Sequence, residues 1–211
     1  MESYIYYPDI VSNNLENDVL LTDLAEDNTY INLFYDALAR IKDSKDSLKE
    51  NYLNIDPRNF ISFPAVIKEG KIVCFSGVIV DKDRWGPNIA RASTRMWIDY
   101  EYRFTGLTKF TGGPQFMNTS YCLPLQIKKA KEQGIQCLFI SREGSSNIGF
   151  KEYLKLIKIN CNVDFKLLPE KYNTCGSLNT IPESCKQFIA VHFLTADGED
   201  VWHQQMSINK I

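Results

Sequence analysis

The sequence predicts an α/β (α+β) fold in which a mixed, mostly antiparallel central sheet is flanked by helices. Two observations lead to this prediction. Between residues 60 and 103, three strand-like segments follow one another through short turns, which is the pattern of an antiparallel meander. A glycine-rich loop, an amphipathic helix and a short apolar run at 135–141 come next, and together they predict a right-handed crossover to a parallel strand.

One helix is predicted before the meander. Thr29 is a suitable N-cap, and apolar residues recur after it at helical spacing. These residues are Tyr30, Leu33, Phe34, Ala37, Leu38 and Ile41. Residues 4–7 have the composition of a short strand, and the charged run at 42–50 is interpreted as the solvated end of the helix or as a loop.

The meander begins with strands at 60–68 and 71–80, joined by a turn at Glu69 and Gly70. The second of these strands is apolar on both faces, so we expect it to lie in the middle of the sheet. A turn at 83–88 then leads into a third strand at 89–103.

The third strand has two unlike faces when its residues are read with a period of two. The small, apolar face consists of Ala90, Ala92, Thr94, Met96 and Ile98. The other face carries Arg91, Ser93, Arg95, Trp97 and Asp99. Because charged groups within a sheet need partners or water, we expect Arg91, Arg95 and Trp97 to line a cleft. The alternative is a solvated salt-bridge ladder, which an Arg95 more exposed than Lys68 or Lys71 would favour.

Pro124 limits where the crossover helix can begin. Proline is tolerated in the first helical turn, so the helix is predicted to start between Ser120 and Leu123 and to end at Gly134. A second amphipathic helix is predicted at 149–159 and a strand within 162–168. Two further strands, at 186–194 and 201–208, are interpreted as a closing hairpin.

Length and charge exclude several classes of protein. The 211 residues suffice for one domain with a sizeable core, and residues 1–211 are treated as a single domain. The formal net charge of −2 and the pI near 5.8 argue against a general nucleic-acid-binding protein. No apolar run approaches the roughly 18 residues of a membrane span, and the N-terminus lacks the features of a signal peptide. We therefore expect a cytoplasmic protein without a membrane or nucleic-acid partner.

The cysteines and histidines favour neither a metal site nor a hydrolase. The six cysteines form no C-x-x-C pair, and Cys74 and Cys137 lie in apolar runs where a thiol behaves as a small hydrophobic group. His192 and His203 are the only histidines, and no carboxylate–cysteine cluster lies near them in the sequence. We therefore predict no metal site and no Ser-His-Asp or Cys-His catalytic arrangement.

Specific residues resemble the GCN5-related N-acetyltransferase (GNAT) family. The run Trp-Ile-Asp-Tyr-Glu-Tyr-Arg at 97–103 is similar to the end of the family's fourth strand, where Tyr-Arg leads into the acyl-CoA loop. Arg103, Gly106 and Thr108 resemble the motif Arg-x-x-Gly-x-Gly/Ala, with threonine in its last place. The resemblance implies that the fourth and fifth strands splay apart to hold the pantetheine of acyl-CoA.

The resemblance continues after this loop and covers roughly residues 60–160. Residues 128–141 resemble the family's next helix and fifth strand, and 149–154 resemble the helix in which many members carry a catalytic tyrosine. The implied activity is transfer of an acetyl or other acyl group from acyl-CoA, with acetyl-CoA as donor, to a primary amine of a small molecule or protein.

The resemblance implies that the donor is bound by the end of the fourth strand, by the loop after it and by the N-terminus of the next helix. Backbone N–H groups and the helix dipole would hold the pyrophosphate. The implied donor-binding residues are Trp97, Ile98, Arg103, Phe104, Thr105, Gly106, Leu107, Thr108, Gly112, Gly113 and Ser120.

Acyl transfer to an amine needs a base for the ammonium proton and often an acid for the leaving thiolate. Tyr153 matches the family's acid position, with a core tyrosine as the alternative. Asp99 and Glu101 are the candidate bases, directly or through water, and the alternative for both is pairing with arginines at 95, 103 or 142. The candidate substrate-binding residues are Arg91, Arg95, Ser141, Arg142 and Glu143.

One departure from the family keeps other functions open. An extra stretch separates Gly106 from the helix start near Leu123, so the phosphate cradle is either rebuilt from residues 112–120 or lost. One alternative is a GNAT-fold protein that uses another acyl donor; the acyl-homoserine-lactone synthases look like relatives of this kind. The other is a non-catalytic module that binds a ligand or a protein. The sequence does not identify the acceptor, and it leaves a homodimer open.

Overall fold

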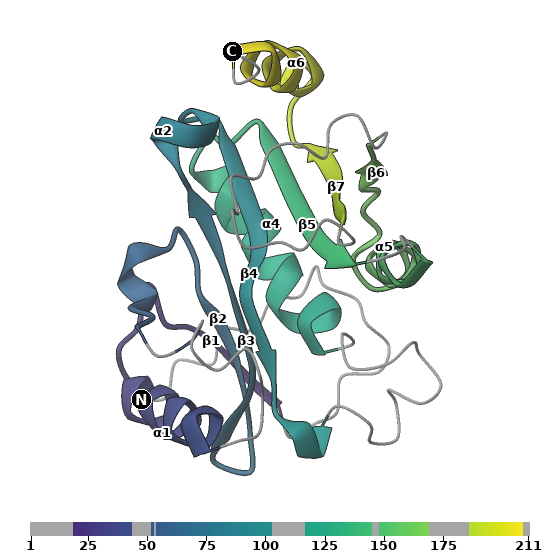
Figure 1. The fold of residues 1–211 in the computed structure, drawn as a ribbon. Coiled ribbons are helices and arrows are strands. Elements are labelled where there is room, and N and C mark those ends of the chain that lie inside the picture. The colour runs from purple at the N-terminus through teal and green to yellow at the C-terminus, as the bar shows by residue number, and fades with distance from the viewer. Residues whose placement is uncertain are drawn as a thin grey trace.

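The computed structural model describes residues 19–43, 52, 54–102, 117–144, 148–168 and 186–208. These residues form a seven-stranded sheet with the order β1-β2-β3-β4-β5-β7-β6 (Figure 1). The elements are β1 (Val19–Asp23), α1 (Ile31–Asp43), η2 (Pro57–Asn59), β2 (Pro64–Lys68), β3 (Lys71–Val80), α2 (Lys82–Trp85), β4 (Ile89–Ile98), η3 (Tyr100–Tyr102), η4 (Asn118–Cys122), α4 (Leu123–Glu132), β5 (Cys137–Gly144), α5 (Ile148–Cys161), β6 (Lys166–Leu167), β7 (Lys186–Phe193) and α6 (Gly198–Ile208). The predicted strand at 4–7 lies outside the described residues.

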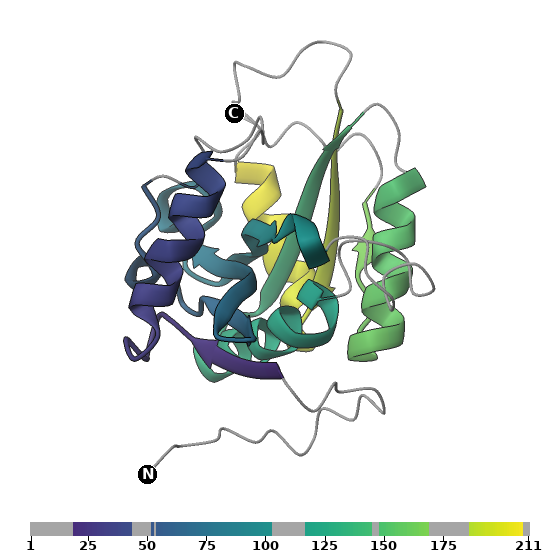
Figure 2. The same cartoon turned by 90° about the horizontal axis from the view of Figure 1, so that it is seen from below.

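The predicted mixed, mostly antiparallel sheet with flanking helices is confirmed. Strands β2, β3 and β4 form the antiparallel meander, with β3 in its middle and buried from Ile72 to Val78. The sequence prediction missed β1, which pairs antiparallel with β2 at the edge of the sheet. Helix α1 packs against one face of the meander and α4 against the opposite face, while α5 lies beside β6 and β7 (Figure 2). No helix of the described residues is long and apolar enough to span a bilayer.

The predicted splay between the fourth and fifth strands is also confirmed. β4 and β5 run parallel but pair only at Ile89 with Cys137, Ala90 with Leu138 and Arg91 with Phe139. From there the two strands separate toward their carboxyl ends (Figure 1). Beyond Arg91, β4 has only β3 as a described strand partner.

Two bulges interrupt the regular alternation predicted for β4. The register with β3 slips on either side of the pair Gly77–Thr94, so β4 carries extra residues there. Ser93 has φ 53° and Arg95 has φ 55°, in the left-handed region that side chains other than glycine rarely adopt. As a result the Ser93 side chain lies on the same face of the sheet as that of Ala92, where α4 and α5 pack.

The crossover helix α4 begins at Leu123, within the predicted range of Ser120 to Leu123. A π-helical turn, η4, precedes α4, and within it the Leu123 N–H donates to the carbonyl of Asn118, five residues earlier. Pro124 lacks an N–H, and its ring would clash with the carbonyl four residues back in an α-helix. Pro124 lies in the first turn of α4, as predicted, and the wider π turn extends the helical segment toward Asn118 on its N-terminal side. At the other end Gly134 has φ 72° and terminates the helix, as predicted.

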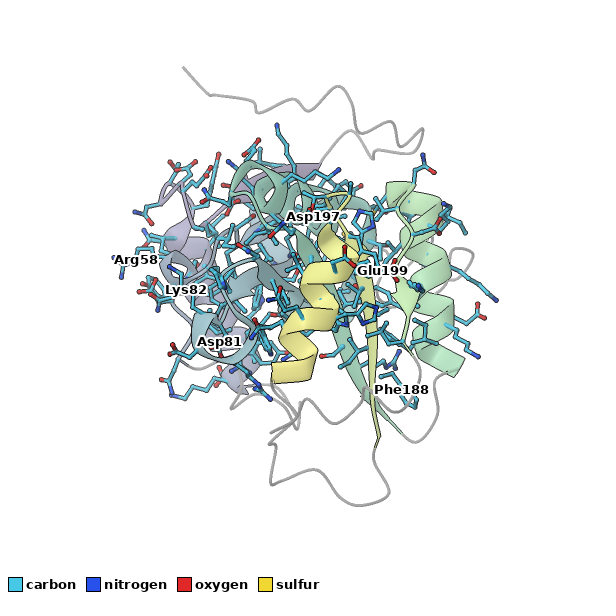
Figure 3. The ribbon with its side chains drawn as sticks, turned by 90° about the horizontal axis from the view of Figure 1, so that it is seen from above. Arg58, Asp81, Lys82, Phe188, Asp197 and Glu199 are labelled. Atoms are coloured by element: carbon cyan, nitrogen blue, oxygen red, sulfur yellow. The ribbon has the colours of Figure 1, made fainter. Side chains whose placement is uncertain are left out.

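The predicted closing hairpin is wrong in its second half. β7 is a strand, but residues 198–208 form helix α6, whose start carries Asp197 and Glu199 (Figure 3). Trp202 anchors this helix in the core beside Phe139, with ring centroids 5.7 Å apart. In the eight residues 201–208, the apolar spacing typical of a strand is hard to distinguish from that typical of a helix. Burial of the Trp202 indole favours the helix. The predicted helix at 149–159 is confirmed as α5, and the predicted strand within 162–168 is reduced to β6.

Gly77, which lies between the two bulges of β4, is expected to tolerate no side chain. A Cβ there would lie 2.8 Å from Cδ2 of Phe63 and still closer to the ring of Phe60. We predict that Gly77→Ala lowers the free energy of unfolding by about 1–3 kcal/mol through overpacking. Urea unfolding of Gly77→Ala, alone and with Phe60→Leu, measures this. An equal loss in both backgrounds would contradict the steric explanation.

Candidate active site

Three polar side chains from three different elements meet where β4 and β5 separate. Ser93 lies on β4, two residues beyond the last pair with β5, Asn118 begins η4, and Tyr153 lies on α5. Asn118 Nδ2 donates to Ser93 Oγ at 3.0 Å and to the Tyr153 hydroxyl at 2.8 Å. The two hydroxyl oxygens lie 3.0 Å apart, within hydrogen-bonding distance. This cluster connects α5 to β4 at the level where the strand ladder has stopped.

Two further side chains fix the orientation of the Asn118 carboxamide. Gln126 on α4 accepts the Ser93 backbone N–H at its Oε1 (2.9 Å) and donates from its Nε2 to the Ser76 carbonyl (3.0 Å). A backbone N–H can only donate and a carbonyl can only accept, so these two bonds set the Gln126 amide. Nε2 also donates to Ser76 Oγ at 2.7 Å, which directs the Ser76 hydroxyl proton to Asn118 Oδ1. With Ser76 Oγ donating to Oδ1, Asn118 Nδ2 faces Ser93 and Tyr153.

Counting donors and acceptors in this network leaves one proton over. Both Nδ2 protons of Asn118 are used, one on each hydroxyl oxygen. Ser93 and Tyr153 together own two hydroxyl protons, and the bond between them uses one. Among the described residues the remaining proton has no acceptor, so this site can donate one hydrogen bond to an incoming group.

Burial keeps the Tyr153 hydroxyl neutral. The side chain is 5% exposed, and Asn118, Gln126 and Ser76 are fully buried. Desolvation raises the pKa of Tyr153 far above its ordinary value, and the bonds from Ser93 and Asn118 offset this only in part. At neutral pH the phenol is therefore protonated and can act as a donor.

The π turn that presents Asn118 is held by the far end of α5. The Cys161 thiol donates to the Thr119 carbonyl at 2.9 Å, and Asn160 Nδ2 donates to Thr119 Oγ1 at 2.8 Å. In the π register, the Thr119 carbonyl is the one that would have bonded an N–H at Pro124. Cys161 therefore satisfies an acceptor that the proline leaves open. Burial raises the pKa of this thiol to about 12, so it remains a donor at neutral pH.

Two expectations for the polar face of β4 are wrong. Trp97 does not line a cleft, because it is 6% exposed and stacks on Phe75 in the core beneath α1. Arg95 is exposed, whereas Lys68 is half-buried, which is the outcome that favours a solvated face. The bulges explain the difference, because they shift Arg95 and Trp97 out of the simple alternation. Arg91 is half-buried and lies opposite Phe139 at the last β4–β5 pair.

The candidate bases differ in their surroundings. Asp99 lies 3.2 Å from Arg40 Nε on α1, and the Arg40 guanidinium also lies over the ring of Trp97. Asp99 thus has an arginine partner, but not one of the three arginines that the sequence suggested. Glu101 is exposed.

The remaining predicted residues are spread around the separation of the strands. Ile98 packs under η4 with Tyr121 and Cys122. Ser120 and Ser141 each carry a buried Oγ that has no hydrogen-bond partner among the described residues. Arg142 is exposed beside Gly149 at the start of α5. The side chain of Glu143 and the loop residues Arg103, Phe104, Thr105, Gly106, Leu107, Thr108, Gly112 and Gly113 lie outside what the structure describes.

The sequence analysis missed Ser76, Asn118 and Gln126 as site residues. Two of them could have been noticed, because Ser76 interrupts the apolar run of β3 and Gln126 falls on the same helical stripe as Leu123, Ile127 and Ala130. Polar residues at positions that should be buried indicate a hydrogen-bonded network. In the described part of the chain, no group of three or more His, Cys, Asp and Glu side chains could hold a metal ion.

Comparison with known proteins finds similarity in structure but not in sequence. No protein-family model matches the chain, and no curated protein is similar to it. A probable acetyltransferase from Staphylococcus epidermidis superposes with a TM-score of 0.52 at 13% identity, covering 84% of this chain and 99% of that one. A GNAT-family acetyltransferase from Streptococcus pneumoniae gives 0.52 at 12% identity, covering 84% and 100%. This chain has the GNAT fold.

The GNAT fold is shared with a further kind of enzyme. A CoA-dependent acyl-homoserine lactone synthase, solved with MTA, superposes with a TM-score of 0.50 at 10% identity, covering 90% of this chain and 89% of that one. At these identities the likeness concerns the fold alone, so the activity has to be argued from the site.

The Cys161 thiol generates a prediction for alkaline pH. Its pKa is about 12 in the folded protein, above the ordinary value near 8.5. As the pH rises through 9, the unfolded chain loses this proton while the folded chain keeps it, so the free energy of unfolding falls. Cys161→Ser keeps a donor for the Thr119 carbonyl but cannot ionise in this range. We predict that the free energy of unfolding of this variant, measured with urea, falls less steeply between pH 9 and 11 than that of the unmodified protein. At pH 7 the two free energies should differ by about 1 kcal/mol or less. Equal slopes would contradict it.

Proposed function

We propose that this protein is an acyl-CoA-dependent N-acyltransferase that moves an acetyl or other acyl group to a primary amine. The observation that carries the proposal is the hydrogen-bonded cluster of Ser93, Asn118 and Tyr153 at the point where β4 and β5 separate, because its donor count leaves one hydroxyl proton spare. The edge of β4 beyond Arg91 has no described strand partner on the β5 side, and backbone groups there bond the pantetheine amides. A thioester placed along that edge brings its sulfur to the buried donor.

The chemistry needs two proton transfers. The amine nitrogen attacks the thioester carbonyl, the C–N bond forms, and the C–S bond breaks. The departing sulfur takes the spare proton, with Tyr153 as the acid, and the high pKa of the buried phenol ensures that the proton is present. Of the two carboxylates, we assign the base role to Glu101, directly or through water, because Asp99 is held by Arg40.

The remaining contacts follow from charge and position. The backbone N–H groups of residues 103–113 and the guanidinium of Arg103 hold the pyrophosphate, together with the start of the helical segment that includes Ser120. Arg142 and Arg95 are exposed and can bind a carboxylate or phosphate of either substrate, and Ser141 and Glu143 flank Arg142 in the sequence. No metal takes part in this scheme.

Titration calorimetry of the full chain with acetyl-CoA is the first test. The second is mass-spectrometric detection of acetylated products in a panel of amino acids, polyamines, aminoglycosides and lysine-containing peptides. Binding with product formation supports the proposal. Binding without any product supports a fold that uses another donor, and no detectable heat supports a non-catalytic module.

Variants of the loop and of the acid separate binding from turnover. We predict that Arg103→Ala weakens acetyl-CoA binding by about 1.5–3 kcal/mol, the range for a hydrogen bond to a charged group. Gly106→Val or Gly113→Val blocks binding, because a β-branched side chain hinders close approach of the backbone and forbids positive φ. Tyr153→Phe leaves the affinity unchanged and lowers turnover by about 10²- to 10⁴-fold.

Arg58→Ala is the matched control for the loss of charge. Arg58 is exposed and bonds to Asp56 within its own turn, so the control is expected to bind acetyl-CoA like the unmodified protein. An Arg103→Ala variant with unchanged affinity would contradict the assigned pyrophosphate site.

A further inference from the structure

We infer that Asn118 is a positioning residue whose carboxamide turns the spare hydroxyl proton of the Ser93–Tyr153 pair outward, toward the leaving group. The inference rests on the proposed function for its catalytic meaning. Its structural content, the direction of a hydrogen bond to Tyr153, stands independently and can be measured on the free protein.

The orientation of the Asn118 amide is fixed by a chain of hydrogen bonds that starts at two backbone groups. The Ser93 N–H and the Ser76 carbonyl fix Gln126, Gln126 fixes the Ser76 hydroxyl, and that hydroxyl fixes Asn118 Oδ1. Asn118, Gln126 and Ser76 have no exposed surface, so water cannot replace a misdirected bond. Reversal of the Asn118 amide would therefore leave buried donors and acceptors without partners, at a substantial cost in free energy.

The direction decides whether a proton is available. With Nδ2 toward Ser93 and Tyr153, both hydroxyl oxygens accept and one hydroxyl proton is left over. With an oxygen in that place, both hydroxyl protons can bond to it, and none is left for another acceptor. An Asn118 amide rotated by 180° would leave Tyr153 in place but without a proton to donate to the leaving group.

Groups near Tyr153 do not compete for this role. The described titratable groups that act on its pKa are the thiols of Cys161 and Cys74, and burial raises the pKa of both. They remain neutral at physiological pH, so burial and hydrogen bonds, and not neighbouring charges, determine the state of the phenol. Asn118 makes the shortest of these bonds, at 2.8 Å.

Asn118→Asp tests the inference because it replaces the donor with an acceptor of nearly the same shape. In protein labelled with [¹³Cζ]tyrosine, the Tyr153 signal is identified as the one that Tyr153→Phe removes. We expect it to move downfield in Asn118→Asp, because the phenol then donates to the carboxyl group. Asn160→Asp is the matched control, since it makes the same change at an amide that bonds to Thr119, and the Tyr153 signal should stay in place. An unmoved signal in Asn118→Asp overturns the inference.

Kinetics with acetyl-CoA and the best amine of the panel supply the second readout. We expect Asn118→Asp to lower kcat by about 10- to 100-fold with KM for acetyl-CoA changed less than about twofold. In the Tyr153→Phe background the same change should cost less than about twofold, because Asn118 acts through Tyr153. Equal losses in both backgrounds would show a general structural role and overturn the inference.

Ser76→Ala is a second variant in case Asn118→Asp does not fold. It removes the proton that orients Asn118 Oδ1 without touching Tyr153, and we expect a kcat loss of about 3- to 10-fold with the same dependence on Tyr153. If the unmodified protein neither binds nor turns over acetyl-CoA, the proposed function fails, and the Tyr153 signal alone decides the inference. If turnover is present and indifferent to Asn118→Asp and Ser76→Ala, the inference fails and the proposed function stands.

Discussion

The short ladder between β4 and β5 is the constraint on which the rest of this structure depends. Three residue pairs join a four-stranded half of the sheet to a three-stranded half, and the described strands offer no other link between them. The remaining cohesion comes from apolar packing on both faces of the sheet. On one face, Trp85 and Ile89 pack with Cys137 and Phe139. On the other face, small side chains make the contact. Ala90 and Ala92 of β4, and Leu138 and Ile140 of β5, pack in one core with Leu123 and Ile127 on the crossover helix. The small alanine side chains let that helix approach the sheet closely enough to contact both halves.

The polar network takes over where this apolar core ends. Ser93 reaches α5 and α4 only because the bulge places it in the left-handed region, a conformation that costs about 1 kcal/mol or more at a residue other than glycine. Hydrogen bonds to Gln126, Asn118 and Tyr153 compensate for this strain. The arrangement ties β4 to η4, α4 and α5 at the level where the ladder between β4 and β5 ends.

Much of the fold could be predicted from the sequence, because period-two and helical patterns reflect burial directly. The meander, β5 and α5 follow from such patterns, and the resemblance at Arg103 and Gly106 pointed to the splay. The bulges at Ser93 and Arg95 could not be predicted, because register depends on the partner strand. The π turn before Pro124 depends on Cys161, which is distant in sequence and supplies the missing donor. For the site, Tyr153 followed from the resemblance, whereas the buried amides of Asn118 and Gln126 acquire meaning only from groups that folding brings together.

The separation of β4 from β5 also bears on association between copies of the chain. An open strand edge on the rim of a sheet is a template for pairing with another molecule, and proteins usually shield it. Here the stretch of β4 that has no described partner on the β5 side lies within its own sheet, and α4 and η4 contact it. Pairing with another copy would require a strand to enter between β4 and β5, which remain joined through the pairs from Ile89 to Arg91. The break in strand pairing therefore lies within the sheet and not on its outer rim, where edge-to-edge association begins.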